Sequence, residues 1–300
     1  MNNIIIKNAA QVVTCSGFEG KRGAEMSNLH VIENGTVIVT DGIISHVLKK
    51  GEAIPIDVSG YKEIDATGKA LLPGFVDPHT HFVFGGHREE EFSWRMRGDS
   101  YMSIMERGGG IVNTTKATRE ASEEELYNSA KRRLDDMLEL GITTVEGKSG
   151  YGLDKDTEMK QLRVMRKLNE DHPMDIVSTF MGPHATPAEW KGREDEFIDF
   201  NINEMLPLVA KEKLAECADI FCEENVFTIE QSRRFLTAAR EHGFLLKLHA
   251  DEIVQFGGAE LAGELKVLSA DHLLQASDEG IKAMADNGVV ATLLPLTAFS

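Results

Sequence analysis

The chain has 300 residues, of which 42% are hydrophobic, so it can bury one large core or form a barrel with a small satellite domain. Its 49 acidic side chains outnumber 32 basic ones, and a net charge of −17 without a long Lys/Arg cluster argues against a nucleic-acid partner. Because no apolar run reaches the length of a membrane span and the N-terminus does not resemble a signal peptide, we expect a cytoplasmic protein that binds no membrane.

The pattern of hydrophobic residues changes near residue 70. Residues 1–70 show short apolar strands separated by turn signals, Asn34-Gly35 and Asp41-Gly42, and this predicts a small β domain. Residues 71–300 show apolar runs that alternate with longer segments of helical period. This second pattern is typical of βα units around a parallel sheet.

The second region contains seven runs that we predict as core strands: 74–81, 141–148, 174–182, 218–224, 243–250, 266–272 and 288–295. Capping chemistry predicts helices between them, for example at Ser122 to Glu125, where a capping box starts a helix that Gly141 ends. The alternation fits either a (β/α)₈ barrel or a doubly wound sheet. A nucleotide-binding doubly wound sheet needs a Gly-rich phosphate turn, and no G-x-G-x-x-G motif follows a predicted strand. We therefore predict an α/β fold of the TIM-barrel type.

Histidines are placed where such a barrel has its active site. Five of them lie at or just beyond the ends of predicted strands: His79, His81, His184, His249 and His272. Any one could be a hydrogen-bonded core residue, but the ends of barrel strands converge on one mouth, and five histidines there favour a metal site. His79 and His81 are two residues apart, so both point to one face of the strand and can reach one ion.

Several stretches carry a resemblance to known enzymes. LLPGFVDPHTH, residues 71–81, resembles the first strand of the amidohydrolase superfamily, which comprises metal-dependent hydrolases on a distorted (β/α)₈ barrel with a small β-sandwich. Further motifs resemble those of the imidazolonepropionase family: FVFGGHREEEF, MERGGGI, KSGYGLDKDTEMKQLR, STFMGPHATP, LHADEI, GGAELAGEL and SADHL. Together they span most of residues 71–300, in the order that the family has.

The resemblance implies a reaction and a set of site residues. The reaction is hydrolysis of the ring amide C–N bond of 4-imidazolone-5-propanoate to N-formimidoyl-L-glutamate, in histidine degradation, by a metal-activated water. The resemblance implies three ligands for one divalent ion, Zn²⁺ or iron: His79, His81 and His249. It implies four substrate-binding residues: Arg88, Tyr101, Tyr151 and His184. It implies two catalytic residues that act on the water and the ring: Glu252 and His272.

The chemistry of these side chains suits the implied roles. Glu252 follows His249 by three residues and can accept the water proton and return it to the ring nitrogen, although an exposed loop carboxylate is the alternative. His272 can orient the water, stabilise the oxyanion or contact the metal. Arg88 can bind the substrate's carboxylate through two parallel hydrogen bonds, or form a surface salt bridge with the glutamates that follow it. Tyr151 can contact the ring or belong to the core.

The sequence departs from the family in one motif. The family's metal site includes an aspartate from the eighth strand, in a motif that resembles TDFNPG, and this sequence lacks it. We therefore expect the natural chain to continue beyond Ser300, with the barrel (71–300) and the sandwich (1–70) both incomplete here. Two other functions stay open: another cyclic amidohydrolase or heterocycle deaminase, and a catalytically inactive scaffold. The expected partner is a small molecule bearing a carboxylate, and a homodimer stays open.

Overall fold

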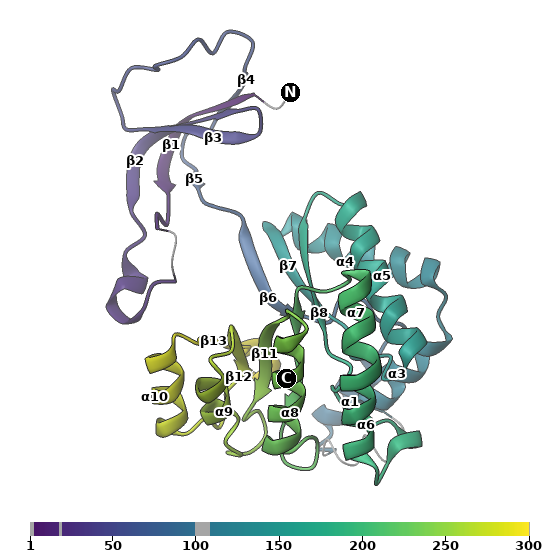
Figure 1. Ribbon diagram of the computed structural model, residues 1–300. Coiled ribbons are helices and arrows are strands. Elements are labelled where there is room, and N and C mark those ends of the chain that lie inside the picture. The colour runs from purple at the N-terminus through teal and green to yellow at the C-terminus, as the bar shows by residue number, and fades with distance from the viewer. Residues whose placement is uncertain (1–2, 18–19, 100–108, 300) are drawn as a thin grey trace. The chain divides into compact units, whose positions relative to one another are not determined.

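The computed structural model describes residues 3–17, 20–99 and 109–299. The chain divides into two compact units, Met1–Gly74 and Phe75–Ser300 (Figure 1). Within the described residues, no helix is both long enough and apolar enough to span a bilayer.

The first unit contains one mixed β-sheet. Its elements are β1 (Ile4–Val13), the 3₁₀ helix η1 (Gly23–Ser27), β2 (Val31–Thr40), β3 (Ile43–Leu48), β4 (Lys62–Asp65) and β5 (Ala70–Leu71). The strand order is β3-β2-β1-β4, and β5 also pairs with β1. The pairs β1–β2 and β2–β3 are antiparallel, whereas β4 and β5 run parallel to β1. A small apolar core packs on this sheet: Ala9, Val12, Val37 and Ala66, with Ile6, Ile32, Val39 and Leu71 against it.

The two predicted turns of this unit have different outcomes. Asp41 and Gly42, with φ of 51° and 83°, form the two-residue connection between β2 and β3, as predicted. The turn predicted at Asn34-Gly35 is wrong, because this pair lies inside β2, beside a register shift in the β1–β2 pairing. The register shift belongs to β1, between Ile6 and Ala9, where Asn8 has a φ of 60°. Asn34 has a φ of 53° within a continuous strand, so an Asn-Gly pair can mark positive φ without marking a turn.

The second unit contains a parallel sheet whose strand order follows the sequence. Its strands are β6 (Phe75–Thr80), β7 (Ile142–Lys148), β8 (Asp175–Phe180), β9 (Cys217–Ala218), β10 (Phe221–Cys222), β11 (Leu245–Ala250), β12 (Ser269–His272) and β13 (Val290–Thr292). The order is β13-β12-β11-β9-β8-β7-β6, and β10 also pairs with β11. β9 and β10 thus share the place of the single strand predicted over 218–224. An order without reversal is that of a (β/α) barrel, not of a doubly wound sheet.

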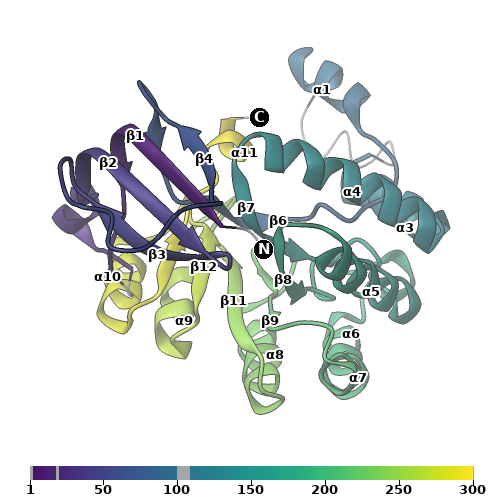
Figure 2. The same ribbon diagram turned by 90° about the horizontal axis from the view of Figure 1, so that it is seen from above.

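The helices of this unit are α1 (Glu89–Met96), α3 (Ile111–Glu120), α4 (Glu123–Glu139), α5 (Lys155–Asp171), η2 (Ala188–Trp190), α6 (Glu194–Phe200), the π-helical η3 (Asn201–Met205), α7 (Leu206–Glu212), α8 (Ile229–Glu241), α9 (Gly258–Leu265), α10 (Asp278–Asn287) and α11 (Pro295–Phe299). Of these, α4, α5, α8, α9 and α10 pack against the strands. Figure 2 shows α4 to α10 following one another around the strands. The predicted capping box starts α4, with Ser122 and Glu125 bonded reciprocally. The α4 face that carries Leu126, Ala130 and Leu134 is buried in the same apolar core as Val145 of β7.

Candidate metal centre

The five histidines predicted at strand ends are neighbours in the structure. The ring centroid of His79 lies 4.6 Å from that of His249 and 4.9 Å from that of His272, and the last two are 4.9 Å apart. His81 stacks on His184 with centroids 4.6 Å apart and an interplanar angle of 10°. We call these five residues the histidine cluster. They come from the ends of β6, β11 and β12 and from the loop after β8.

The cluster contains sets of ligand atoms close enough to share an ion. In two sets all ligand atoms lie within 4.8 Å of one another: His79 with His249 and His272, and His81 with His184 and His249. Neither set holds all three predicted ligands, His79, His81 and His249. Their ring centroids are nevertheless 4.6 to 5.8 Å apart, so the three rings are mutual neighbours.

Two carboxylates fix the tautomers of two of these rings. Nδ1 of His79 lies 2.7 Å from Oδ2 of Asp271, and Nδ1 of His249 lies 3.0 Å from Oδ2 of Asp219. Both aspartate side chains are fully buried. A carboxylate only accepts hydrogen bonds, so each Nδ1 carries the proton and each Nε2 keeps a free lone pair.

Backbone carbonyl oxygens fix the tautomers of two more rings. Nδ1 of His81 lies 2.9 Å from the carbonyl oxygen of Ser149, and Nδ1 of His184 lies 2.9 Å from that of Gly150. Both carbonyls belong to the segment that directly follows β7. Four imidazoles of the cluster therefore have Nε2 available, which is the atom that a metal ion would take.

The surroundings also keep the rings neutral. Burial, together with the neighbouring histidines, holds the pKa of His81 and of His249 well below the usual value. Burial is likewise the main cause that lowers the pKa of His184 and of His272 to about 4. Neutral imidazole is the form that binds a metal, so at neutral pH the donor set fits a divalent ion that prefers nitrogen ligands.

A second group of charged side chains lies buried against the cluster. We call it the buried charge network: Glu146, Lys148, Asp219, Lys247 and Asp271. Lys148 Nζ lies 2.7 Å from Asp219 Oδ2, 3.2 Å from Asp271 Oδ2 and 2.9 Å from Glu146 Oε1. Burial alone would lower the pKa of Lys148, but these carboxylates outweigh it and raise the pKa above its usual value.

The network also bears on where an ion would bind. Asp219, His249 and Asp271 form a third set of ligand atoms within 4.8 Å of one another. In this set the two carboxylates already have a cation between them, the ammonium of Lys148. The histidine sets, which have neutral donors and no such counter-charge, are therefore the better candidates.

Glu252 lies in the loop after β11, beside the cluster. Its Oε1 is 3.4 Å from Nδ1 of His272, and its side chain is 26% exposed. Burial and the nearby carboxylate of Glu223 raise the pKa of Glu252 to about 7. Two buried carboxylates hold this loop by accepting backbone N–H groups: Asp251 from Phe256, Gly257, Gly258 and Ala259, and Glu223 from Ile253 and Val254.

Tyr151 borders the other side of the cluster. Its ring centroid lies 5.1 Å from that of His81 and 5.4 Å from that of His184. The carboxylate of Glu158, itself buried, accepts hydrogen bonds from three backbone N–H groups around Tyr151: Gly150, Gly152 and Leu153. One side chain of α5 therefore anchors the loop that carries Tyr151.

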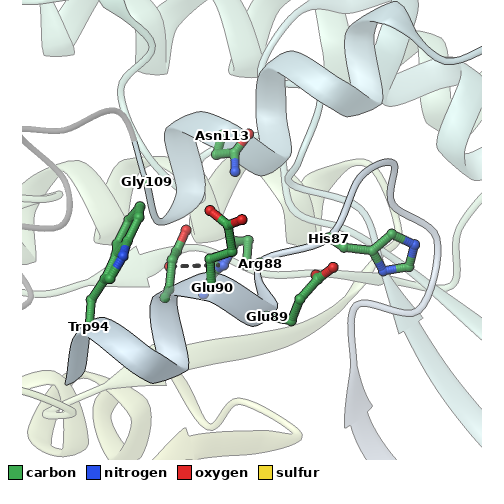
Figure 3. Close-up of a pocket in the computed structure, with 8 residues that line it drawn as sticks. His87, Arg88, Glu89, Glu90, Trp94, Gly109 and Asn113 are labelled. Atoms are coloured by element: carbon green, nitrogen blue, oxygen red, sulfur yellow. Dashed lines mark ion pairs between the residues drawn. The ribbon is translucent and has the colours of Figure 1, made fainter. Parts of the chain in front are cut away.

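Arg88 pairs with a glutamate three residues further along the chain. Its Nε lies 3.3 Å from Oε2 of Glu91, which is the salt bridge considered as the alternative to substrate binding. Arg88 lines a pocket of about 360 Å³, together with His87, Glu89, Glu90, Glu91, Trp94, Gly109 and Asn113. Figure 3 shows Arg88 among these residues. None of the five clustered histidines is among these lining residues. Tyr101, the remaining predicted substrate residue, lies outside the described residues.

Several residues of this site had no predicted role: Glu146, Lys148, Asp219 and Asp271. Each is a charged residue within an apolar strand or next to one, where charges occur only when they are paired, and this signal could have found them. Asp77 accepts a long 3.4 Å bond from the backbone of His79 and not from its ring.

Solved structures with the same fold include several hydrolytic enzymes. A 5-methylcytosine deaminase from Klebsiella pneumoniae aligns with a TM-score of 0.65 at 16% identity, over 96% of this chain and 65% of that chain. An amidohydrolase aligns with a TM-score of 0.62 at 15% identity, over 96% of this chain and 65% of that one. No family model matches the chain. The barrel and the separate mixed sheet thus define a fold of the amidohydrolase type.

The sequence places the chain more narrowly within that fold class. It is 63% identical over 298 residues to the imidazolonepropionase of Clostridium tetani, over 99% of this chain and 71% of that protein. It is 64% identical over 302 residues to the imidazolonepropionase of Phocaeicola vulgatus, over 100% of this chain and 72% of that protein. The chain belongs to the imidazolonepropionase family. The predicted fold class, family and hydrolase assignment are thereby confirmed.

Proposed function

We propose that the protein hydrolyses 4-imidazolone-5-propanoate to N-formimidoyl-L-glutamate. The observation that carries this proposal is the 63% identity to an imidazolonepropionase over 99% of the chain. The histidine cluster, with four free Nε2 atoms beside Glu252, gives the reaction a chemical basis. Cleavage of the ring C–N bond needs a nucleophilic water at the carbonyl carbon and a proton on the departing nitrogen.

The metal ligands in this proposal are His79, His81 and His249, and they would hold one divalent ion, Zn²⁺ or iron. In each of them Nδ1 contacts an oxygen acceptor, which leaves Nε2 to face an ion, and this supports the choice. An ion bound by imidazoles would keep its full positive charge, and it would supply an activated water at neutral pH and polarise a carbonyl oxygen.

Glu252 is the proton carrier of the proposal. A carboxylate with a pKa of about 7 is half ionised at neutral pH, so it can both accept the water proton and deliver it to the ring nitrogen. His272, which is neutral and 3.4 Å from Glu252, would orient the water or donate a hydrogen bond to the developing oxyanion.

The substrate would be held from two directions. Tyr151 and His184 would contact the planar ring, since the ring of Tyr151 lies 5.4 Å from that of His184, a member of the cluster. Arg88, and Tyr101 with it, would bind the propionate side, and Arg88 would exchange its bond to Glu91 for one to the substrate carboxylate. We further propose a cytoplasmic enzyme whose partner is this small molecule, without a nucleic-acid or membrane ligand. A homodimer is compatible with the proposal.

The proposal is tested by turnover of 4-imidazolone-5-propanoate, followed as loss of its ultraviolet absorbance. Zinc-loaded protein should consume the compound, chelator-treated protein should not, and adding zinc back should restore the rate. His249→Ala should abolish turnover, whereas His242→Ala, at an exposed position at the end of α8, should retain it. Failure of the folded protein to consume the compound when loaded with zinc and when loaded with iron rules out this function.

A further inference from the structure

Two proposed metal ligands depend on carboxylates that share one lysine. Oδ2 of Asp219 accepts a bond from His249 Nδ1 and, at 2.7 Å, from Lys148 Nζ. Oδ2 of Asp271 accepts a bond from His79 Nδ1 and lies 3.2 Å from the same Nζ. The ammonium thus contacts the very oxygen atoms that bind the two imidazoles.

Because these side chains are buried, the two carboxylates need the lysine between them to stay close together. The side chains of Lys148, Asp219 and Asp271 have no exposed surface. Two buried carboxylates whose oxygens both lie within about 3 Å of one point would repel each other without a cation between them. They would then separate or take up protons, and either change would alter the hydrogen bonds that they accept from His249 and His79.

We propose that Lys148 is a positioning residue of the metal site: its ammonium holds Asp219 and Asp271 where they keep His249 and His79 in the tautomer with Nε2 free. The inference rests on the proposed function, because it takes these two histidines as metal ligands. Lys148 itself touches neither the metal nor the substrate in this account. Carboxylates that orient metal-bound histidines typically affect metal affinity about 10- to 100-fold.

Asp219 shows why an uncharged amide cannot replace the carboxylate. Its Oδ1 accepts the backbone N–H of His249 at 3.1 Å, while Oδ2 accepts from the His249 ring and from Lys148. Every neighbour is a donor, so the NH₂ group of an asparagine would face a donor in either orientation. With NH₂ at the Oδ2 position, Nδ1 of His249 would have to accept, and the proton would move to Nε2 and block the metal-binding lone pair.

The first test compares Lys148→Met with Lys247→Met. Lys247 is a buried lysine of the same network, but it pairs with Glu146 at 3.2 Å and reaches Asp271 only at 3.6 Å. Zinc affinity is measured by competition with a chelating dye, and cobalt is used as a spectroscopic probe. Lys148→Met should bind zinc about 10- to 100-fold more weakly and change the visible cobalt spectrum, and Lys247→Met should lose less than about tenfold.

A second test covers the case in which Lys148→Met does not fold. Asp219→Asn keeps the size of the side chain, and ¹⁵N NMR of imidazole-labelled, metal-free protein reports the tautomer of each histidine. We expect His249 to carry its proton on Nδ1 in the unsubstituted protein and on Nε2 in Asp219→Asn, with zinc affinity again lowered about 10- to 100-fold.

The outcomes separate this inference from the proposed function. If the unsubstituted protein binds neither zinc nor cobalt, the proposed metal site fails and this inference fails with it. If it binds metal, but folded Lys148→Met or Asp219→Asn binds equally well with an unchanged cobalt spectrum or His249 tautomer, only the positioning role is overturned.

Discussion

Oε1 of Glu252 and Nδ1 of His272 lie 3.4 Å apart, which joins a carboxylate from the loop after β11 to a histidine at the end of β12. The histidine has a pKa of about 4 and the carboxylate a pKa of about 7. At neutral pH the pair therefore holds a neutral imidazole beside a carboxyl group that can lose or gain a proton. Environments that separate pKa values in this way are typical of acid–base catalysis.

Replacing Glu252 by glutamine should remove the proton carrier while keeping the shape of the site. We expect kcat to fall about 100-fold or more, with zinc content unchanged, because general acid–base catalysis contributes about 10²- to 10⁴-fold. In the unsubstituted enzyme, kcat/KM should rise with pH through about 7, as Glu252 loses its proton. The exposed neighbour Glu224→Gln is the control, and an unchanged pH profile in Glu252→Gln would exclude Glu252 as the base.

The same substitution should stabilise the metal-free protein at high pH. Glu252 has a folded-state pKa of about 7 and an ordinary value of 4.5, so the folded state binds more protons between these limits. Stability is therefore lost as pH rises from 4.5 to about 7. Glu252→Gln should gain on the order of 1–3 kcal/mol in unfolding free energy at pH 8, and nothing at pH 4. Denaturant unfolding of both proteins at pH 4 and at pH 8 measures this difference. Equal free energies of unfolding at pH 8 would contradict the claim that burying the ionised Glu252 carboxylate costs stability.

Arg88→Met should weaken substrate binding without affecting the metal. Loss of a hydrogen bond to a charged group costs about 1.5–3 kcal/mol, which predicts a rise in KM of about 10- to 100-fold. Zinc content should stay the same, because Arg88 pairs with Glu91 and not with the histidine cluster. Arg193→Met is a matched control, since Arg193 makes a similar 3.3 Å bond to the glutamate three residues on. Unaltered steady-state kinetics would remove Arg88 from the substrate site.

Glu158→Ala should destabilise the loop that carries Tyr151. The buried carboxylate accepts three backbone N–H groups, and buried donors without partners cost about 1–3 kcal/mol each. We expect the free energy of unfolding to fall by about 2–5 kcal/mol, after some relaxation of the loop. Glu170→Ala, at an exposed position of the same helix α5, should change it by less than about 0.5 kcal/mol. A similar small effect for both variants would refute the anchoring role.

Local patterns in the sequence predicted the elements that place the site. The H-x-H spacing of His79 and His81 follows from strand geometry, and the alternation of strands and helices fixes which strand ends meet. The convergence of five histidines could be predicted because it needs only the order of the elements. The capping box of Ser122 and Glu125 could be predicted for the same reason, since its partners are three residues apart.

Long-range pairing could not be predicted in this way. Lys148 pairs with Asp219, 71 residues further along the chain, and nothing local specifies that partner. The strand predicted over 218–224 is split into β9 and β10, which both pair with β11. The bond between Asp271 and His79 depends likewise on the packed structure. The sequence thus indicated which histidines converge better than which charged residues pack against them.

Diffraction from zinc-supplemented crystals, recorded on both sides of the zinc absorption edge, tests the central claim most directly. The account predicts one anomalous peak about 2.0–2.1 Å from Nε2 of each of His79, His81 and His249, with Lys148 still between Asp219 and Asp271. A peak bound to the two aspartates in place of the lysine, or no peak near these three histidines in zinc-replete crystals, would contradict it.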